Sequence, residues 1–254
     1  MQATGLGRVL FGLSFVLLGA FSIFFPGFAA AWPMVPKWMP GHDVLFTFSG
    51  ALLLVGGILC LFRRTASLAA LALSAILLVR LALLHVRPVI ARPLLEGTWE
   101  ELSESLVFLA GAWTIFSLSR GGQSGLERFG NVRLGQILFA LALPAIGLSH
   151  FVYLGETAPL IPSWLPLHVP LAWFTGAAHI AAGLAILFLV LPGLAATLEA
   201  VMVSLFTLLV WVPMVFAAPG TAGNWSELGV SAAISGAAWA VAESFRTAIA
   251  FRGS

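Results

Sequence analysis

The chain contains an internal repeat, and no other feature constrains its fold as strongly. The motif Pro-x-Trp-x-Pro-x-His occurs at residues 36–42 and again, 126 residues later, at 162–168. The motif Trp-x-Glu-Leu follows at the same offset, at 99–102 and 225–228. Matching Trp, Pro, His and Glu residues in one register indicate an internal duplication. A residue present in both halves is expected to serve the shared architecture, whereas a residue unique to one half is the better candidate for specific chemistry.

The composition predicts that this duplicated fold lies in a membrane. Hydrophobic residues make up 60% of the chain and charged residues 9%, whereas soluble domains carry about 25% charged residues. Several apolar stretches reach the ~20 residues with which a helix crosses a bilayer. The chain is therefore expected to be an integral membrane protein. Its net charge of +2 gives no indication of a nucleic-acid partner.

Hydropathy and helix-breaking residues predict eight transmembrane helices, four in each half. The predicted spans are about 7–25, 43–62, 66–86, 100–118, 133–153, 168–190, 194–216 and 226–248, with boundaries accurate to about two to four residues. The corresponding domains are a first repeat at 1–119, a cytoplasmic linker at 120–132 and a second repeat at 133–254. An even number of spans per half makes the repeats run in the same direction. We therefore expect an all-α fold of two four-helix bundles related by an axis along the membrane normal.

Small residues recur at seven-residue spacing within the first two predicted helices of each half. Seven residues are close to two helical turns, so each pair lies on one helix face and predicts the close approach of a neighbouring helix. The pairs are Gly12 and Gly19, Gly50 and Gly57, Ala140 and Gly147, and Gly176 and Gly183.

The distribution of basic residues predicts the orientation. Cytoplasmic loops of membrane proteins carry an excess of Lys and Arg. One side of the predicted bundle receives Arg8, Arg63, Arg64, Arg120, Arg128, Arg133, Arg246 and Arg252, and the other receives Lys37, Arg87 and Arg92. The protein is therefore expected in a bacterial inner membrane with both termini in the cytoplasm. Lys37 and Glu100 are expected outside, and Arg64 and Arg128 inside.

Some histidines are shared between the halves and others are unique to one half. His42 and His168 are equivalent, and both metal binding or proton relay and capping of the following helix remain open for them. His85, His150 and His179 each occur in one half only. An ionisable residue inside a membrane is a candidate functional group, and bonding to a neighbouring helix is the structural alternative.

The unique histidines of the second half predict a ligand site beneath segment 161–166. His150 would contact the ligand near the outer surface and His179 would contact it more deeply. Trp164 and Trp173 would supply apolar walls. Replacement of His179 by Leu would then weaken binding and leave folding nearly intact.

Arg80 and Glu199 are the charges placed furthest inside the predicted spans. Glu104 lies on the following helix at a depth that Arg80 can reach, so we predict a structural ion pair between these two residues, unique to the first half. A pair of Arg80 with Glu199 is expected to be too long, because they lie near opposite ends of their helices. Glu199 is a candidate intramembrane charge that Arg246 could neutralise, with Glu243 nearby.

Several kinds of chemistry are excluded by missing motifs. Cys60 is the only cysteine, so the chain has no intramolecular disulfide and no CxxC pair. It also contains no glycine-rich phosphate loop, zinc-protease motif or Gly-x-Ser-x-Gly elbow. Its five histidines are too scattered along the sequence to define a metal site. These absences favour a protein without catalytic activity of its own.

The second half resembles the DoxX superfamily of small four-helix membrane proteins. It contains His150-Phe151, then Pro-Ser-Trp-Leu-Pro at 162–166, then Thr175-Gly176 and a later glycine at 183. The family pattern is similar: a first helix that ends in His-Phe, a Pro-x-Trp-Leu-Pro segment, and a second helix that opens with Thr-Gly. The first half is a weaker copy in which Ser22-Ile23 replaces His-Phe. The chain thus looks like a tandem duplication of the DoxX unit.

This resemblance implies a function connected with redox chemistry. The family includes a membrane subunit of thiosulfate:quinone oxidoreductase and other proteins associated with redox complexes. It therefore implies a non-catalytic membrane subunit or a protein that binds a lipophilic, quinone-like ligand, with membrane or periplasmic redox subunits as partners. Redox roles that need paired cysteines cannot apply to this chain.

Two alternative functions remain open. One is a transporter for a small molecule or ion, with a path between the two halves, and the other is a membrane assembly scaffold. A continuous apolar groove facing lipid would favour ligand binding, whereas a polar cavity between the halves would favour transport.

Overall fold

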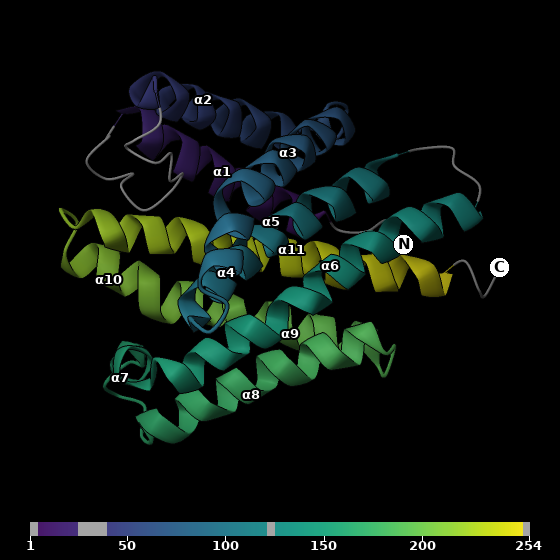
Figure 1. Cartoon of the computed structure of the whole chain (residues 1–254). Coiled ribbons are helices and arrows are strands. Elements are labelled where there is room, and N and C mark those ends of the chain that lie inside the picture. The colour runs from purple at the N-terminus through teal and green to yellow at the C-terminus, as the bar shows by residue number, and fades with distance from the viewer. Residues whose placement is uncertain (1–4, 25–39, 121–124, 251–254) are drawn as a thin grey trace.

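The computed structural model describes residues 5–24, 40–120 and 125–250, and within these ranges it contains helices and no strand (Figure 1). In this described part of the chain, eight helical spans are long and apolar enough to cross a membrane. The chain is therefore a multi-pass integral membrane protein with an all-α fold. The spans are Leu6–Phe24, Val44–Leu61, Ala66–Ala91, Glu96–Ser119, Val132–Val152, His168–Leu187, Pro192–Ala217 and Ala222–Arg246, and each overlaps one predicted span.

The two halves contain the same succession of spans. The first half consists of α1 (Leu6–Phe24), α2 (His42–Leu61), α3 (Ala66–Arg80), η1 (Leu81–His85), α4 (Val86–Ala91) and α5 (Glu96–Ser119). The second half consists of α6 (Gly125–Val152), α7 (Leu154–Thr157), η2 (Ala158–Leu160), α8 (His168–Leu187), α9 (Pro192–Phe206), η3 (Thr207–Trp211), α10 (Val212–Ala217) and α11 (Ala222–Ala250). Because α6 begins at Gly125, part of the segment predicted as a linker is helical. The domain boundaries stay predictions.

The repeat extends to details of local structure. A π-helical turn interrupts the third span of each half, and these turns, η1 and η3, start at equivalent positions. Near the start of each fourth span, an indole N–H donates to a proline carbonyl oxygen. Trp99 donates to Pro93, and Trp225 donates to Pro219, both at 2.9 Å. Equivalent sequence positions thus adopt equivalent local structures.

The bundle has two ends, which we name by their residues. The tryptophan face carries Trp99, Trp164 and Trp225, and the arginine face carries Arg8, Arg120 and Arg246. α1 begins and α11 ends at the arginine face (Figure 1). The assignment of this face to the cytoplasm stays a prediction.

Glycines allow the first two helices of each half to approach closely. A Cβ atom on Gly57 of α2 would lie 2.7 Å from the carbonyl oxygen of Gly12 on α1. A Cβ atom on Gly183 of α8 would lie 2.8 Å from the carbonyl oxygen of Ala140 on α6. Real Cβ atoms do not approach so closely, so only glycine fits these positions without a shift of backbone. The close packing predicted from the seven-residue spacing is confirmed.

The two halves are interlocked through their last helices. α5 packs along α6, and α11 packs along α1, so the fourth span of each half lies against the first span of the other half. α5 and α11 also contact each other and are the most buried of the eight spans. Among the described residues, each of these contacts between spans has its counterpart in the other half, as a pseudo-twofold axis requires. The eight expected helices are present among the described residues. Because the contacts extend across the boundary between the two expected bundles, the arrangement as two four-helix bundles stays a prediction.

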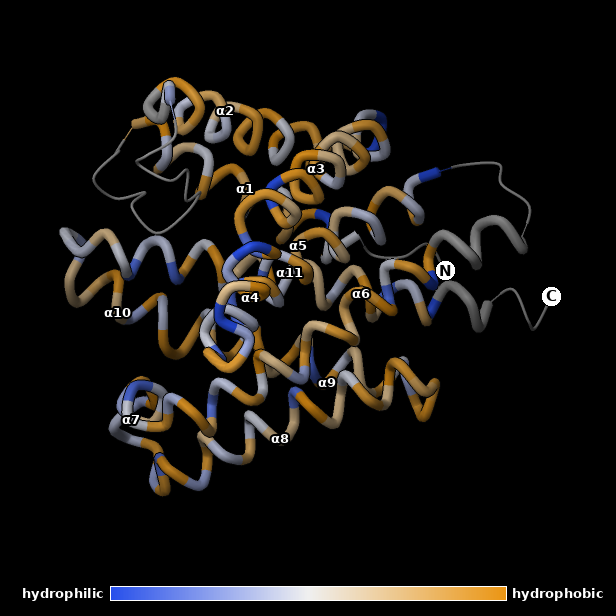
Figure 2. The backbone as a smooth tube through the Cα atoms, viewed as in Figure 1, coloured by the Kyte–Doolittle hydropathy of each residue, from blue (hydrophilic) through white to orange (hydrophobic). Residues whose placement is uncertain are grey.

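Apolar side chains cover the outside of the bundle. Leu68, Leu83 and Phe216 are among the large hydrophobic residues that point away from the protein. Hydrophobic residues continue along most of each span, and many hydrophilic residues lie near the helix ends (Figure 2). This surface is suited to contact with lipid.

Candidate ligand-binding site

A cavity of about 1120 Å³ lies mainly in the second half. Its walls come from α6, α8, α9 and η3, with contributions from α5 and α11 and from the segment that leads into α8. Small-molecule sites in proteins commonly have volumes of about 300–1,000 Å³. The cavity is therefore large enough to hold a ligand of considerable size.

The cavity is elongated along the helices. Its lining on α8 extends from Leu171 to Ala185, which corresponds to roughly 20 Å at the rise of an α-helix. The lining on α8 includes the small side chains of alanines 178, 181, 182 and 185, which leave space in the cavity. This shape can accommodate an extended apolar chain.

The cavity reaches the lipid-facing surface between α8 and α9. Phe174 on α8 and Leu194, Leu198 and Leu205 on α9 line the cavity and are also exposed on the outside of the protein. Near the tryptophan face, residues of segment 161–165 contribute to the lining. A lipophilic molecule could therefore enter from the membrane without crossing a polar barrier.

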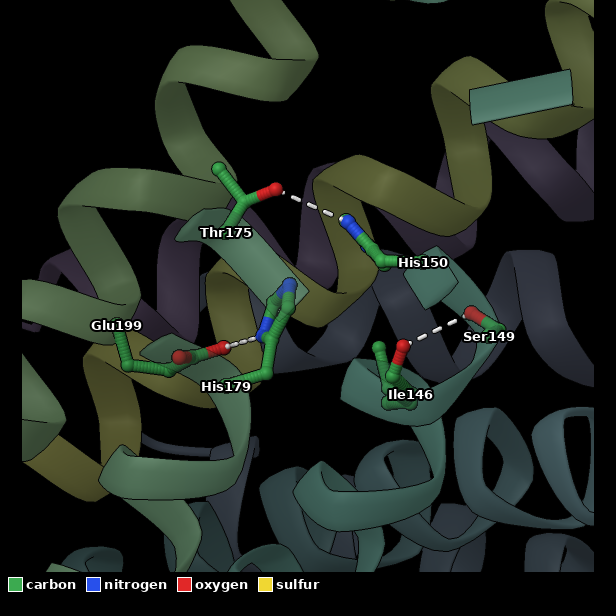
Figure 3. A network of polar contacts seen from close by, with 6 residues as sticks. All are labelled: Ile146, Ser149, His150, Thr175, His179 and Glu199. Carbon is green, nitrogen blue, oxygen red and sulfur yellow. Dashed lines mark hydrogen bonds and ion pairs between the residues drawn. The ribbon is translucent and has the colours of Figure 1, made fainter. Parts of the chain in front are cut away.

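His179 and Glu199 form a buried pair in the cavity wall. Nδ1 of His179 lies 2.7 Å from Oε1 of Glu199 (Figure 3). The two residues are only 2% and 1% exposed, and Oε2 of Glu199 has no hydrogen-bond partner among the described residues. Since an isolated charge is costly in such surroundings, each of the two side chains is held in place by its contact with the other.

A second histidine completes the polar part of the site. Nδ1 of His150, near the end of α6, lies 3.0 Å from the hydroxyl of Thr175 on α8 (Figure 3). The rings of His150 and His179 are 5.1 Å apart between centroids, and Phe206 of α9 lies 6.2 and 6.0 Å from them. Two imidazoles and one phenyl ring thus meet on one side of the cavity.

Carboxyl groups from both halves also line the cavity. Glu100 and Glu104 come from α5, and Glu227 comes from α11. Because α5 belongs to the first half, both halves contribute to the site.

The first half has different residues at the equivalent positions. Ser22 aligns with His150, and Arg80 aligns with Phe206. Leu53 and Leu73 align with His179 and Glu199, and both leucines are fully buried in the core. The polar pair therefore belongs to the second half alone and is not needed to build the shared fold.

The structure brings together two of the four predicted ligand contacts. His150 and His179 line the same cavity. Trp164 and Trp173 do not line it and are 68% and 48% exposed, so the apolar walls come from other residues. Binding by any of these residues stays a prediction.

The other predicted residues have different surroundings. Arg80 ends α3 and is half-buried, and Glu104 is half-buried at the cavity; their ion pair stays a prediction. Glu199 contacts His179, while Arg246 is exposed near the end of α11. The partner of Glu199 in the structure is therefore His179, whereas Arg246 was the partner expected from the sequence.

The shared histidines stand at helix starts. α2 begins at His42 and α8 at His168, each preceded by a residue with left-handed backbone conformation, Gly41 or Leu167. Neither helix start has a side-chain capping hydrogen bond at its N-cap residue. His85 is buried in η1. Residues 35–39, which carry most of the first Pro-x-Trp-x-Pro segment, lie outside the described residues.

The His179–Glu199 contact was not predicted, although the sequence contains a signal for it. His179 lies eight residues before the end of α8, and Glu199 lies seven residues after the start of α9. Both are thus about 11 Å from the same turn. Comparing depths measured from a common turn would have placed these two residues together.

The fold and the site define a multi-pass α-helical membrane protein with an intramembrane cavity. No family model matches the chain, and no curated protein or solved structure is significantly similar to it. The function is therefore argued from the residues and their geometry.

Proposed function

We propose that this protein binds a lipophilic molecule with a polar, quinone-like head group in the cavity of its second half. The observation that carries the proposal is an apolar cavity, open toward lipid, with the buried His179–Glu199 pair in its wall. Ligand sites typically combine apolar walls with a few polar groups that orient the ligand. This cavity has that combination.

The duplication argues that the polar pair has a specific role. A histidine and a glutamate inside a membrane protein are costly to bury. The first half has Leu53 and Leu73 at the equivalent positions, so the fold itself does not require polar groups there. Binding of a polar head group gives the pair a function.

A flat ring suits the arrangement of side chains around the polar groups. Phe206 and the two imidazoles offer ring surfaces at which an aromatic head can pack. Histidine can exchange protons near neutral pH, which is the chemistry that a quinone–quinol couple needs. The sequence resemblance to DoxX proteins supports a place for the protein in a redox complex as a membrane subunit.

Transport is the second candidate function, supported by the carboxyl groups of Glu100, Glu104 and Glu227 and by the contribution of both halves to the cavity. The lining is nevertheless mostly apolar and continues to the lipid-facing surface. A path for ions would instead need polar groups along its length. Binding of a lipophilic ligand therefore explains the apolar lining of the cavity better than ion transport does.

The proposal is tested by filling the cavity with a larger side chain. Ala178 is half-buried and lines the cavity, and its equivalent in the first half is the half-buried Leu52. Ala178→Phe should weaken the binding of an alkylbenzoquinone at least tenfold, and Leu52→Phe should leave it unchanged. Binding is measured by equilibrium displacement in lipid nanodiscs. Equal binding by the wild type and both variants would overturn the proposal.

A further inference from the structure

The hydroxyl of Thr175 fixes the tautomer of His150. A threonine hydroxyl has one proton, and Thr175 donates it to the carbonyl oxygen of Ala172 at 3.0 Å. It therefore accepts the 3.0 Å hydrogen bond from Nδ1–H of His150. In a neutral imidazole with a proton on Nδ1, Nε2 is an acceptor. His150 thus offers a lone pair to the cavity that it lines.

The His179–Glu199 pair offers the opposite polarity. In surroundings this apolar, a pair with net charge zero is favoured over a pair with net negative charge. One shared proton gives zero charge, either as imidazolium with carboxylate or as imidazole with carboxylic acid. In both forms Nδ1 is engaged with Glu199 and Nε2 of His179 carries a hydrogen. His179 is therefore a donor.

The ring that carries the donor and the ring that carries the acceptor are thus neighbours in the cavity wall. The two ring centroids are 5.1 Å apart, and each ring contacts its side-chain partner, Thr175 or Glu199, through Nδ1. A hydroxyl oxygen can accept from one nitrogen and donate to the other. A carbonyl or an ether oxygen can only accept, which would leave Nε2 of His150 unsatisfied.

We infer that the cavity selects a hydroxyl-bearing head group that bridges His179 and His150. This inference rests on the proposed function and deepens it, because it names the reduced form of the ligand as the one preferred. The shared chemistry is a hydroxyl on a long apolar tail, as in a hydroquinone, an alkylphenol or a long-chain alcohol. A site built around a hydroxyl rejects an analogue that lacks it, because its polar groups are then left unpaired.

The test compares ligands that differ only in the head group. An alkylresorcinol, whose two hydroxyls cannot be oxidised to a quinone, is compared with its dimethyl ether and with an alkanol of matched length. Binding is measured in nanodiscs containing the full chain. We expect the resorcinol to bind at least tenfold more tightly than the ether. Equally tight binding by the alkanol would support the hydroxyl chemistry and identify an aliphatic alcohol as a source of it.

A matched pair of variants tests the role of His150. Thr175→Val removes the group that fixes the tautomer while keeping the size of the side chain, so Nε2 can then carry the proton. The preference for resorcinol over ether should fall toward one. Ser49→Ala removes the hydroxyl at the equivalent position of the first half and should leave the preference unchanged. An unchanged preference in Thr175→Val would overturn the inference.

The outcomes separate this inference from the proposed function. If the ether and the resorcinol bind equally and Ala178→Phe weakens both, the cavity binds lipophilic ligands and the hydroxyl preference is wrong. If Ala178→Phe affects neither compound, the proposed function itself is wrong.

Discussion

At the scale of single residues, the feature that distinguishes this chain from a generic apolar bundle is the contact between His179 and Glu199. Both side chains are almost fully buried, and each lies where the other half has a buried leucine. The energetic role of such a pair depends on both partners being present. Removing one leaves the other without compensation, whereas replacing both by apolar residues can be nearly neutral.

This asymmetry changes the expected effect of His179→Leu. From the sequence alone, the variant was expected to fold nearly as well as the wild type. With Glu199 left alone in the wall, it should instead lose ~3–5 kcal/mol of stability. Glu199→Leu should cost less, because an imidazole can remain neutral. The double variant His179→Leu/Glu199→Leu should approach wild-type stability, since it reproduces the arrangement of Leu53 and Leu73.

Thermal unfolding of the four proteins in detergent, followed by size-exclusion chromatography, measures these differences as a double-mutant cycle. Additive losses in the double variant would show that the two side chains do not stabilise each other.

At the scale of elements, the helices are positioned by glycines that face backbone. Gly57 packs against α1 with no room for a side chain, whereas a Cβ atom on Gly155 of α7 would meet nothing within 4 Å. The two glycines therefore differ in their tolerance of the same substitution.

Gly57→Ala should destabilise the protein by about 1–3 kcal/mol, because α1 and α2 must move apart. Gly155→Ala should change the stability by less than about 0.5 kcal/mol. Denaturation in mixed micelles measures both values against the wild type. A tolerated Gly57→Ala would mean that α1 and α2 are not held at the distance seen here.

The elements also show how far the sequence could predict this structure. Length and hydropathy were sufficient for all eight spans, because crossing a bilayer fixes both quantities. The π-helical turns η1 and η3 were not predicted, because one additional residue in a turn leaves an apolar pattern apolar. His150 and His179 were placed in one site because they are unique to the second half. The partners of the helices in the bundle could not be predicted, since apolar faces do not specify which neighbour covers them.

At the scale of the whole molecule, the described parts of the first and last spans both reach the arginine face, and positive charge there predicts that this face is cytoplasmic. The structure provides accessible positions at both ends. Leu94, between α4 and α5, is fully exposed near the tryptophan face, and Arg64, in the turn between α2 and α3, is exposed at the arginine face.

Cysteines placed at these two positions in a Cys60→Ala background should differ in their access to an impermeant thiol reagent. In intact cells, Leu94→Cys should be labelled and Arg64→Cys should be labelled only after the membrane is opened. The reverse pattern would invert the predicted topology.

The interlocked halves have a consequence for the ancestry of the cavity. In a homodimer of unfused second halves, pseudosymmetry would place a second copy of α11 where α5 now lies. That copy carries Ser226 and Val230 at the positions equivalent to Glu100 and Glu104. Each pocket of such a dimer would contain both histidines but would lack the two carboxyl groups that α5 supplies here. In the fused chain the two copies differ, so α5 supplies carboxyl groups to a pocket whose histidines come from the second half.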